Sequence, residues 1–414
     1  MQQFFKRLLA TAVLGLALPG AALAQSTDTL PQGHVVPQAQ GSAAAGHDVT
    51  PDASPRSGGD AGVGALRRAI PFEIGQRNVK SILIDGRDVW IGSSGGAIRY
   101  DTHRGSYLTY NNKSGLLSNG VFHVSKSGGN IWIGTYGGGL SVFDAATETW
   151  QNYNIPNGMG DAFVYDALET ENGDIWIATW SGANRIRGGA MDDISKWDLY
   201  TVANTGGGLP NDWVYGLAAG KNGEIWMATE GGLARFKDET WTHWTHADGL
   251  GAPLELVKGN ITLTNDPGKV SSHHARQKEE QGLSDVKVAY NPNYIVSLSI
   301  APNGDVWAGT WGAGLSRFDG ENWQTFTVAD GLPSNHVFAL HTDEAGRLWV
   351  GTNRGLAILD GGKFTLYGPE SGLNVQSIFA IATSGDTAWV GGFGGVTWFP
   401  AGLGSKPKDH TGGN

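Results

Sequence analysis

The sequence predicts an all-β protein, a seven-bladed β-propeller of four-stranded antiparallel blades. Three observations carry this prediction. One motif recurs seven times, its usual period is that of a propeller blade, and the chain of 414 residues contains 64 glycines and 16 tryptophans. Tight glycine turns between short aromatic strands are typical of such blades.

The repeated motif is an apolar strand with a tryptophan, a glycine turn and a second strand, as in IWIGTYGGGLSVFD at 131–144. Its copies are marked by Trp90, Trp132, Trp176, Trp226, Trp307, Trp349 and Trp389. The differences between these numbers are 42, 44, 50, 81, 42 and 40 residues. The separation of 81 marks an insertion of about one repeat length.

Each copy divides into four expected strands. In the sixth copy these are HVFALHT at 336–342, RLWVGT at 347–352, GLAILD at 355–360 and KFTLYG at 363–368. Polar turns with glycine, such as DEAG and ENGD, separate the first two strands, as hairpins require. The aromatic residues of the fourth strand are expected to pack between neighbouring blades.

The seventh copy ends near residue 400 without a fourth strand of its own. The segment AIPFEIG at 69–75 precedes the first copy and reads as an orphan strand. We therefore expect this N-terminal strand to complete the last blade and close the ring. The alternative is a loose leader.

The glycines of the motif do not indicate a nucleotide site. Gly134 and Gly139 have the spacing of a phosphate-binding loop, but the next residues are Leu140 and Ser141, so the lysine that should reach the phosphates is missing. The formal net charge of −10 argues against nucleic acid as a partner. Without cysteine, the chain has no disulfide and no thiolate metal site. No cofactor is expected.

The N-terminus has the pattern of a signal peptide at 1–24: Lys6 and Arg7, an apolar run, and an A-x-A cleavage site ending at Ala24. A Pro/Gly/Ser/Ala-rich linker is expected at 25–68, the propeller at 69–402 and a flexible tail at 403–414. No later apolar run reaches membrane-spanning length. These features predict a periplasmic or secreted protein, expected to be a monomer.

The units, with GLPSNHVFALHTDEAGRLWVGT at 331–352 as the clearest, resemble the two-component regulator propeller repeat. The resemblance covers roughly residues 70–400. It implies a propeller like those in the periplasmic sensing regions of hybrid two-component sensors, which also occur as solitary extracytoplasmic proteins. Since the chain shows no transmembrane, kinase or receiver region, only a binding or partner role is expected to carry over.

A candidate binding rim is formed by the residue after each W-x-G-T-like run, on the face where propellers usually bind. These residues are Ser94, Tyr136, Trp180, Glu230, Trp311, Asn353 and Phe393. The position varies between copies while its neighbours hardly change, which predicts exposure. Such a rim suits a small molecule, a glycan, a peptide or an envelope protein. The alternative is that these residues only cover the blade ends.

A second set lies on the first strand: Ser81, His123, Asp166, Gly216, Ser297, Ala339 and Ala380. Small residues dominate, as expected beside a narrow channel. His123 and Asp166 are exceptions in adjacent blades. They are candidates for an acid–base pair, or for a structural hydrogen bond.

The insertion at 252–290, between blades four and five, is expected to be an elaborated loop on the binding face, acting as a lid or docking arm. His273 and His274 lie on it and are weak metal candidates, and His243 and His246 precede it. His243 and His246, three residues apart on a strand, would face opposite ways. No metal is therefore expected.

These features favour a non-catalytic binding module. An enzyme of the lyase type using His123, Asp166 or the insertion histidines is the alternative. It is less favoured because no Ser/His/Asp, Cys/His or paired-carboxylate arrangement stands out. A scaffold that assembles an envelope complex is the third possibility.

Overall fold

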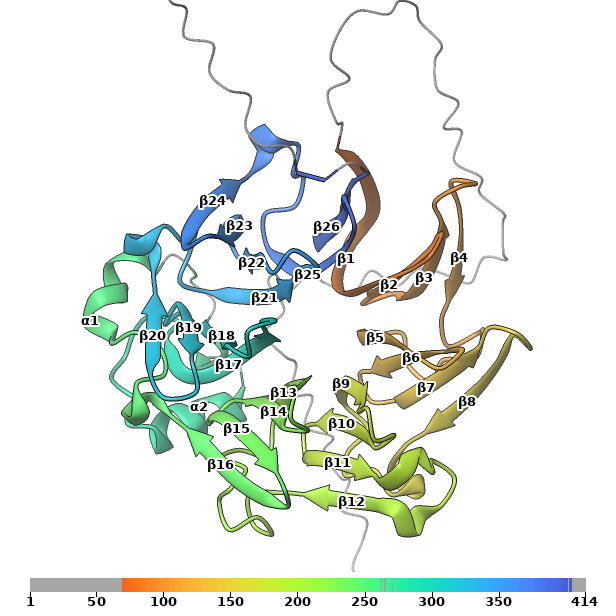
Figure 1. Cartoon of the computed structure of the whole chain (residues 1–414), viewed down its shortest axis with the longest axis horizontal. Helices are drawn as coiled ribbons and strands as arrows, with labels where there is room; N and C mark the ends of the chain where they lie inside the picture. Colours follow the sequence, from red (N-terminus) through yellow and green to blue (C-terminus); the bar gives the residue numbers. More distant parts are fainter. Residues whose placement is uncertain (1–68, 262, 264–265, 270, 401, 404–414) are drawn as a thin grey trace, which may run out of the picture.

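The sheets stand in a ring around a central axis, each with one strand nearest the axis and the others farther out (Figure 1). The computed structural model describes residues 69–261, 263, 266–269, 271–400 and 402–403. The predicted signal peptide, the linker and the tail beyond residue 403 lie outside the described residues. Within the described ranges, no helix is long and apolar enough to cross a membrane.

Five antiparallel sheets contain four strands each, in which consecutive strands pair. Three of them comprise β5 (Val121–Ser127), β6 (Asn130–Thr135), β7 (Gly139–Asp144) and β8 (Thr149–Tyr153); β9 (Val164–Glu169), β10 (Ile175–Thr179), β11 (Gly182–Ile186) and β12 (Trp197–Tyr200); and β13 (Val214–Ala219), β14 (Ile225–Thr229), β15 (Gly232–Lys237) and β16 (Thr240–Trp244). The other two comprise β17 (Asn291–Ile300), β18 (Val306–Trp311), β19 (Leu315–Phe318) and β20 (Trp323–Phe326); and β21 (Val337–Thr342), β22 (Leu348–Thr352), β23 (Gly355–Asp360) and β24 (Lys363–Tyr367).

Two long strands join the two ends of the propeller. β1 (Ile70–Asp85) pairs over residues 79–85 with β2 (Asp88–Ser93), and over residues 70–73 with residues 395–398 of β26 (Thr387–Phe399). With β3 (Gly96–Asp101), β4 (Ser106–Tyr110) and β25 (Ile378–Ser384), they form one set in the order β25-β26-β1-β2-β3-β4.

The inner strands contact one another in cyclic order, from β1 through β5, β9, β13, β17 and β21 to β25, which contacts β1 again. The fold is therefore an all-β propeller, as the sequence predicts.

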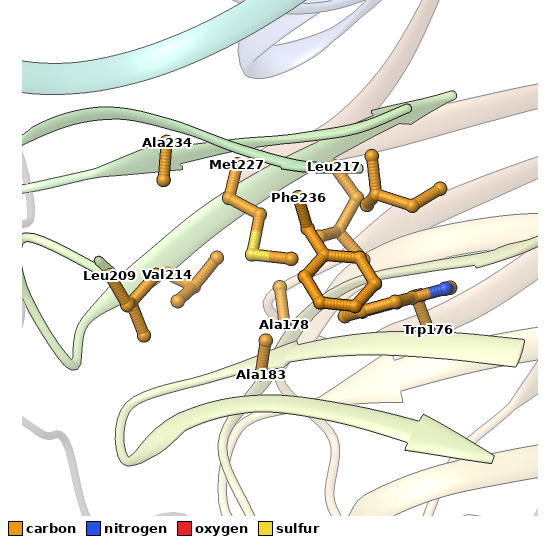
Figure 2. Close-up of a cluster of buried hydrophobic side chains, with 10 residues drawn as sticks. Trp176, Ala178, Ala183, Leu209, Val214, Leu217, Met227, Ala234 and Phe236 are labelled. Atoms are coloured by element: carbon orange, nitrogen blue, oxygen red, sulfur yellow. The ribbon is translucent and has the colours of Figure 1, made fainter. Parts of the chain in front are cut away.

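The core lies between neighbouring sheets. Figure 2 shows Trp176 from β10 beside Phe236 and Met227 from the β13–β16 sheet. The ring centres of Trp176 and Phe236 are 5.1 Å apart, and Tyr200 of β12 stacks on Trp176. The repeated tryptophan of the second strand and the aromatic residue of the fourth strand thus pack sheet against sheet. Burying such a side chain contributes about 1.5–3 kcal/mol.

The repeated turn between the second and third strands is closed by a hydroxyl. Thr229 is fully buried, and its Oγ1 donates to the carbonyl of Gly232 at 2.8 Å and accepts the N–H of Gly231 at 3.1 Å. Equivalent bonds hold the turns after Thr135, Thr179, Thr310 and Thr352. The glycine-threonine pattern of the sequence is therefore turn chemistry.

Helices are few. The described part of the 252–290 insertion contains α1 (Leu254–Val257), α2 (Ser272–Glu280) and no strand, so it adds no further sheet to the ring. Short 3-10 helices are η1 (Ile155–Asn157), η2 (Arg187–Gly189), η3 (Ile194–Lys196), η4 (His246–Asp248), η5 (Lys258–Asn260), η6 (Pro267–Lys269), η7 (Val328–Asp330) and η8 (Pro369–Ser371).

Candidate functional site

Each inner strand carries a β-bulge at the same place in its pairing with the second strand. In β5, Val121 pairs with Thr135 and His123 with Gly134, so Phe122 is an extra residue without a partner. Bulges of this kind bend a strand and re-aim a side chain. The extra residues are Lys80, Phe122, Tyr165, Tyr215, Val296, Phe338 and Phe379, and all are partly exposed.

These bulges build a chain of aromatic rings, here called the aromatic collar. Its members are Phe122, Tyr165, Tyr215, Tyr294, Trp311, Phe338 and Phe379. Successive ring centres lie 4.7, 4.9, 4.9, 5.6, 5.6 and 5.3 Å apart. Where the bulge residue is Val296, Tyr294 and Trp311 bridge the gap. The collar therefore passes from sheet to sheet around the inner strands.

The inner strands also line a cavity of about 200 Å³. Lys80 and Asp166 both line it, so it holds one amine and one carboxylate. The Lys80 Nζ lies 3.9 Å from the centre of the Phe379 ring. Burial lowers the pKa of Lys80 to about 8. This amine therefore gains or loses its proton near neutral pH.

A second aromatic group, here called the stacked ladder, continues from the collar to the insertion. It contains Phe163, Trp180, Trp213 and His273 with nearly parallel rings, whose centres lie 4.2, 4.4 and 3.4 Å apart in that order. Tyr165 of the collar also packs on Trp180, at 6.1 Å. All four ladder side chains are partly exposed, so parts of the stacked rings are accessible to solvent.

The residues of the predicted rim differ in their exposure to solvent. Ser94 and Phe393 are exposed, while Tyr136, Trp180 and Asn353 are partly exposed. Glu230 and Trp311 are 1% and 8% exposed, so the expectation of an exposed position is wrong for these two. The insertion is the reason for Glu230, because α2 contacts its side chain with His273 and His274. Trp311 instead packs within the collar, between Tyr294 and Phe338.

Glu230 joins the rim to the insertion. Its Oε1 lies 2.6 Å from His274 Nδ1, and its Oε2 lies 2.9 Å from His273 Nε2. Burial raises the pKa of Glu230, but the hydrogen bonds from the two imidazoles outweigh it and hold the pKa below its ordinary value. His246 instead bonds the carbonyl of Leu250 through Nδ1, away from this cluster, and His243 is exposed.

His123 and Asp166 do lie together, with 2.9 Å between Nδ1 and Oδ1. Asp166 Oδ2 also accepts the backbone N–H of Leu217 at 2.8 Å. The pair therefore ties β5, β9 and β13 together. His123 Nε2 is buried and makes no hydrogen bond among the described residues, so the nitrogen that a general base needs does not reach solvent.

Sequence reasoning missed the collar because it chose the next residue along each inner strand. Six of those residues do line the cavity, as alternation predicts: Ser81, Asp166, Gly216, Ser297, Ala339 and Ala380. The bulge adds one further side chain to each inner strand, at a position that alternation does not mark. A signal was present: an aromatic residue follows Val121, Val164, Val214, Val337 and Ile378 in five of the seven copies.

A model of the two component regulator propeller family matches residues 208–231 and 331–354. A search of curated proteins found no match. Similar solved structures include extracellular domains of two putative hybrid two component systems from B. thetaiotaomicron. They are 22% and 18% identical, with TM-scores of 0.59 and 0.58, and the matches cover 78% and 82% of this chain and 39% and 44% of theirs.

The chain thus spans about two fifths of the length of these sensor domains. Virginiamycin B lyase from Staphylococcus aureus, in a complex with quinupristin, is 14% identical with a TM-score of 0.57 over 80% of this chain and 98% of the lyase. At such identities the likeness shows the fold alone. Two segments of this chain therefore match the model of the two component regulator propeller family, and the chain shares the β-propeller fold of these solved structures.

Proposed function

We propose that this protein is an extracytoplasmic, non-catalytic binding module that recognises a ligand or a partner protein on the loop face of its propeller. The observation that carries the proposal is the continuity of the aromatic collar, the stacked ladder and the exposed part of the rim. Tyr136 connects them, because its ring packs against Phe122, Phe163 and Trp180. Partly exposed aromatic surface on this scale is typical of recognition sites.

The ligand class follows from the side chains. Ring faces stack on sugar rings, planar groups or apolar peptide side chains, at about 0.5–1.5 kcal/mol for each aromatic pair beyond burial. Burial raises the pKa of Tyr165 and of Tyr215, so both hydroxyls stay protonated at neutral pH. These features support a small molecule, a glycan or a peptide, or an envelope protein that offers such a segment.

The finer architecture belongs to the same proposal. We infer seven blades, with residues 70–73 of β1 as the outer strand of the last blade. The pairing of Phe72 with Val396 and the cyclic order of the inner strands support this arrangement. The cleavable segment predicted at 1–24 and the extracellular origin of the similar sensor domains support a periplasmic or secreted location.

The test compares two pairs of substitutions. Tyr136→Ser with Phe393→Ser removes aromatic surface from the loop face. Leu108→Ser with Leu366→Ser removes apolar side chains of 57% and 47% exposure from the outer strands β4 and β24. Each protein is used as bait in an envelope extract and on glycan and peptide arrays. We expect the loop-face pair to lose captured species at an unchanged melting temperature, and the outer pair to retain them.

Equal capture by both variants would contradict loop-face recognition. Equal loss by both would indicate adsorption to apolar surface.

A lyase-type enzyme remains the alternative. The one observation in its favour is the His123–Asp166 pair, and the buried, unpartnered Nε2 of His123 counts against it. The virginiamycin B lyase likeness adds the fold and no residue role.

A further inference from the structure

The insertion contacts the β13–β16 sheet through one small cluster. Helix α2 places His273 and His274 on the carboxylate of Glu230, which follows β14. Neighbouring helical residues point about 100° apart, yet both rings reach the same group because they use different nitrogens, Nε2 of His273 and Nδ1 of His274. Residues 43 and 44 positions apart along the chain thus bring three metal-ligand groups together.

Helix α2 has no apolar face that would hold it in place. Its sequence is SHHARQKEE, in which alanine is the only apolar residue. Its further contacts are ring stacking of His273 on Trp213 and of His274 on Tyr294, and polar bonds. Gln277 Oε1 accepts from Asn211 Nδ2 at 2.9 Å, and Lys278 Nζ lies 2.6 Å from Asp266 Oδ2. Such bonds contribute only about 0.5–1.5 kcal/mol each. A nine-residue helix is only marginally stable alone, so its position depends on these contacts, in which His273 and His274 take the largest part.

A cavity of about 10 Å³ adjoins Glu230 and His274, roughly the space of one water molecule or one ion. Asp266, Lys278 and Tyr294 also line it. His274 is 2% exposed, and its Nε2 makes no hydrogen bond within the described ranges. A buried polar atom without a protein partner is usually satisfied by a bound water or ion. His273 does not line this cavity and reaches Glu230 from outside it.

The carboxylate of Glu230 is buried beside the two imidazoles. Its side chain is 1% exposed, and among the described residues no lysine or arginine forms an ion pair with it. A buried carboxylate without a cation is costly. The Lys278 ammonium lines the cavity, but it is paired with Asp266.

We propose that Glu230, His273 and His274 bind one divalent transition-metal ion, with Zn²⁺ the best suited. The three donor atoms lie within 4.8 Å of one another. Two imidazole nitrogens and a carboxylate oxygen are a donor set for zinc and related ions, whereas calcium and magnesium prefer oxygen alone. A fourth position is left for water or for a ligand atom.

The ion has a mechanical consequence for the loop face. It links α2 to the turn after β14, and so fixes the insertion at 252–290 over the β13–β16 sheet. It also holds His273 in the stacked ladder against Trp213. The cation site therefore sets the edge of the aromatic surface. The proposal stands without the binding role proposed above.

The experiment uses the full chain, stripped with EDTA and titrated calorimetrically with ZnCl₂. Glu230→Gln keeps the shape of the side chain and removes its charge, and His274→Asn removes one nitrogen ligand. His243→Gln, at an exposed histidine of the adjacent β16, is the matched control. We expect the wild type and the control to bind one more Zn²⁺ per chain than either site variant, or to bind it at least 100-fold more tightly.

The visible absorption spectrum of bound Co²⁺ tests the site in the wild-type protein, without any variant. The wild-type protein is expected to give the intense visible absorption of four-coordinate cobalt, displaced by one equivalent of Zn²⁺. If circular dichroism shows that the site variants are less folded in EDTA, the Co²⁺ absorption spectrum of the wild-type protein is the deciding test of the metal site. Equal zinc stoichiometry and affinity in all four folded proteins, or a Co²⁺ spectrum like that of the free aqueous ion, would overturn the proposal. Neither measurement depends on a loop-face ligand, so its failure is distinct from that of the binding function.

Discussion

Single residues determine whether the repeated turn can form. Gly182 begins β11 with φ of +105°, and a Cβ at this position would overlap the backbone oxygen of Tyr200. Gly173 also has positive φ, of +83°, but a Cβ there meets no atom within 4 Å. The two glycines therefore separate backbone strain from steric overlap.

We predict that Gly182→Ala lowers the free energy of unfolding by about 1–3 kcal/mol more than Gly173→Ala does, because overpacking adds to the cost of positive φ. Urea unfolding of both variants measures the difference. Equal losses would show that the carbonyl of Tyr200 moves aside and that the glycine is needed for its φ alone.

His336 is buried, and its Nε2–H donates to the carbonyl of Ala289 at 2.8 Å. Its Nδ1 is buried without a partner in the described structure, so a second proton would create a buried, unpaired charge. Burial accordingly lowers the pKa of His336 to about 4. The unfolded chain, with a pKa near 6.5, binds this proton first.

Stability is therefore complete above pH 6.5 and falls as the pH drops toward 4, by up to about 3 kcal/mol from this residue. Urea unfolding at several pH values should show a steeper fall for the wild type than for His336→Gln, whose amide can still donate to Ala289. Parallel curves would contradict the assignment, as would an NMR titration that places the His336 transition near pH 6.5.

At the scale of elements, the inner strands are fastened to one another by buried polar side chains. Asp166 on β9 accepts from Leu217 on β13 and lies against His123 on β5. The sequence identified this pair, and its position in adjacent inner strands follows from the repeat. Its structural role depends on the orientation of His123 Nε2, which no sequence pattern encodes.

We predict that Asp166→Ala lowers the free energy of unfolding by about 1–3 kcal/mol, since it leaves the Leu217 N–H and His123 without a partner. Asp166→Asn should cost less, because its amide oxygen can still accept from Leu217. Asp198→Ala, which removes an ion pair with the largely exposed Arg187, should cost less than about 1 kcal/mol. Denaturant unfolding of the three variants provides the measurement, and a ranking with Asp198→Ala as the most harmful would refute the argument.

The insertion was only partly predictable from the sequence. Its boundaries and its lack of the strand motif were readable, and its place over the loop face followed from chain order. That α2 would cover Glu230 was not readable, because nothing local to residues 272–280 specifies a partner 43 positions earlier in the chain. The sequence therefore predicted an exposed side chain at Glu230, whereas the insertion covers it.

At the scale of the whole molecule, the repeat period determines the architecture. Each sheet buries its faces only against its neighbours, so a chain of such units gains by returning to its start. The all-β propeller was predictable because period, turns and aromatic positions agree. The collar was not, because it depends on a one-residue bulge that alternation cannot reveal. Because Ile70 pairs directly with Trp398, closure of the ring can be tested at these two residues.

The absence of cysteine allows a direct test of that closure. Ile70→Cys with Trp398→Cys places two thiols on directly paired residues of β1 and β26. If this strand pair closes the ring in solution, the double variant should form an intramolecular disulfide, detected by mass and thiol titration. The oxidised form should be about 2–4 kcal/mol more stable than the same protein reduced, and so melt several degrees higher. Comparing two redox forms of one variant cancels the cost of removing Trp398. Thiols that remain free under oxidising conditions, or identical melting of the two forms, would show that the ends do not hold the ring together.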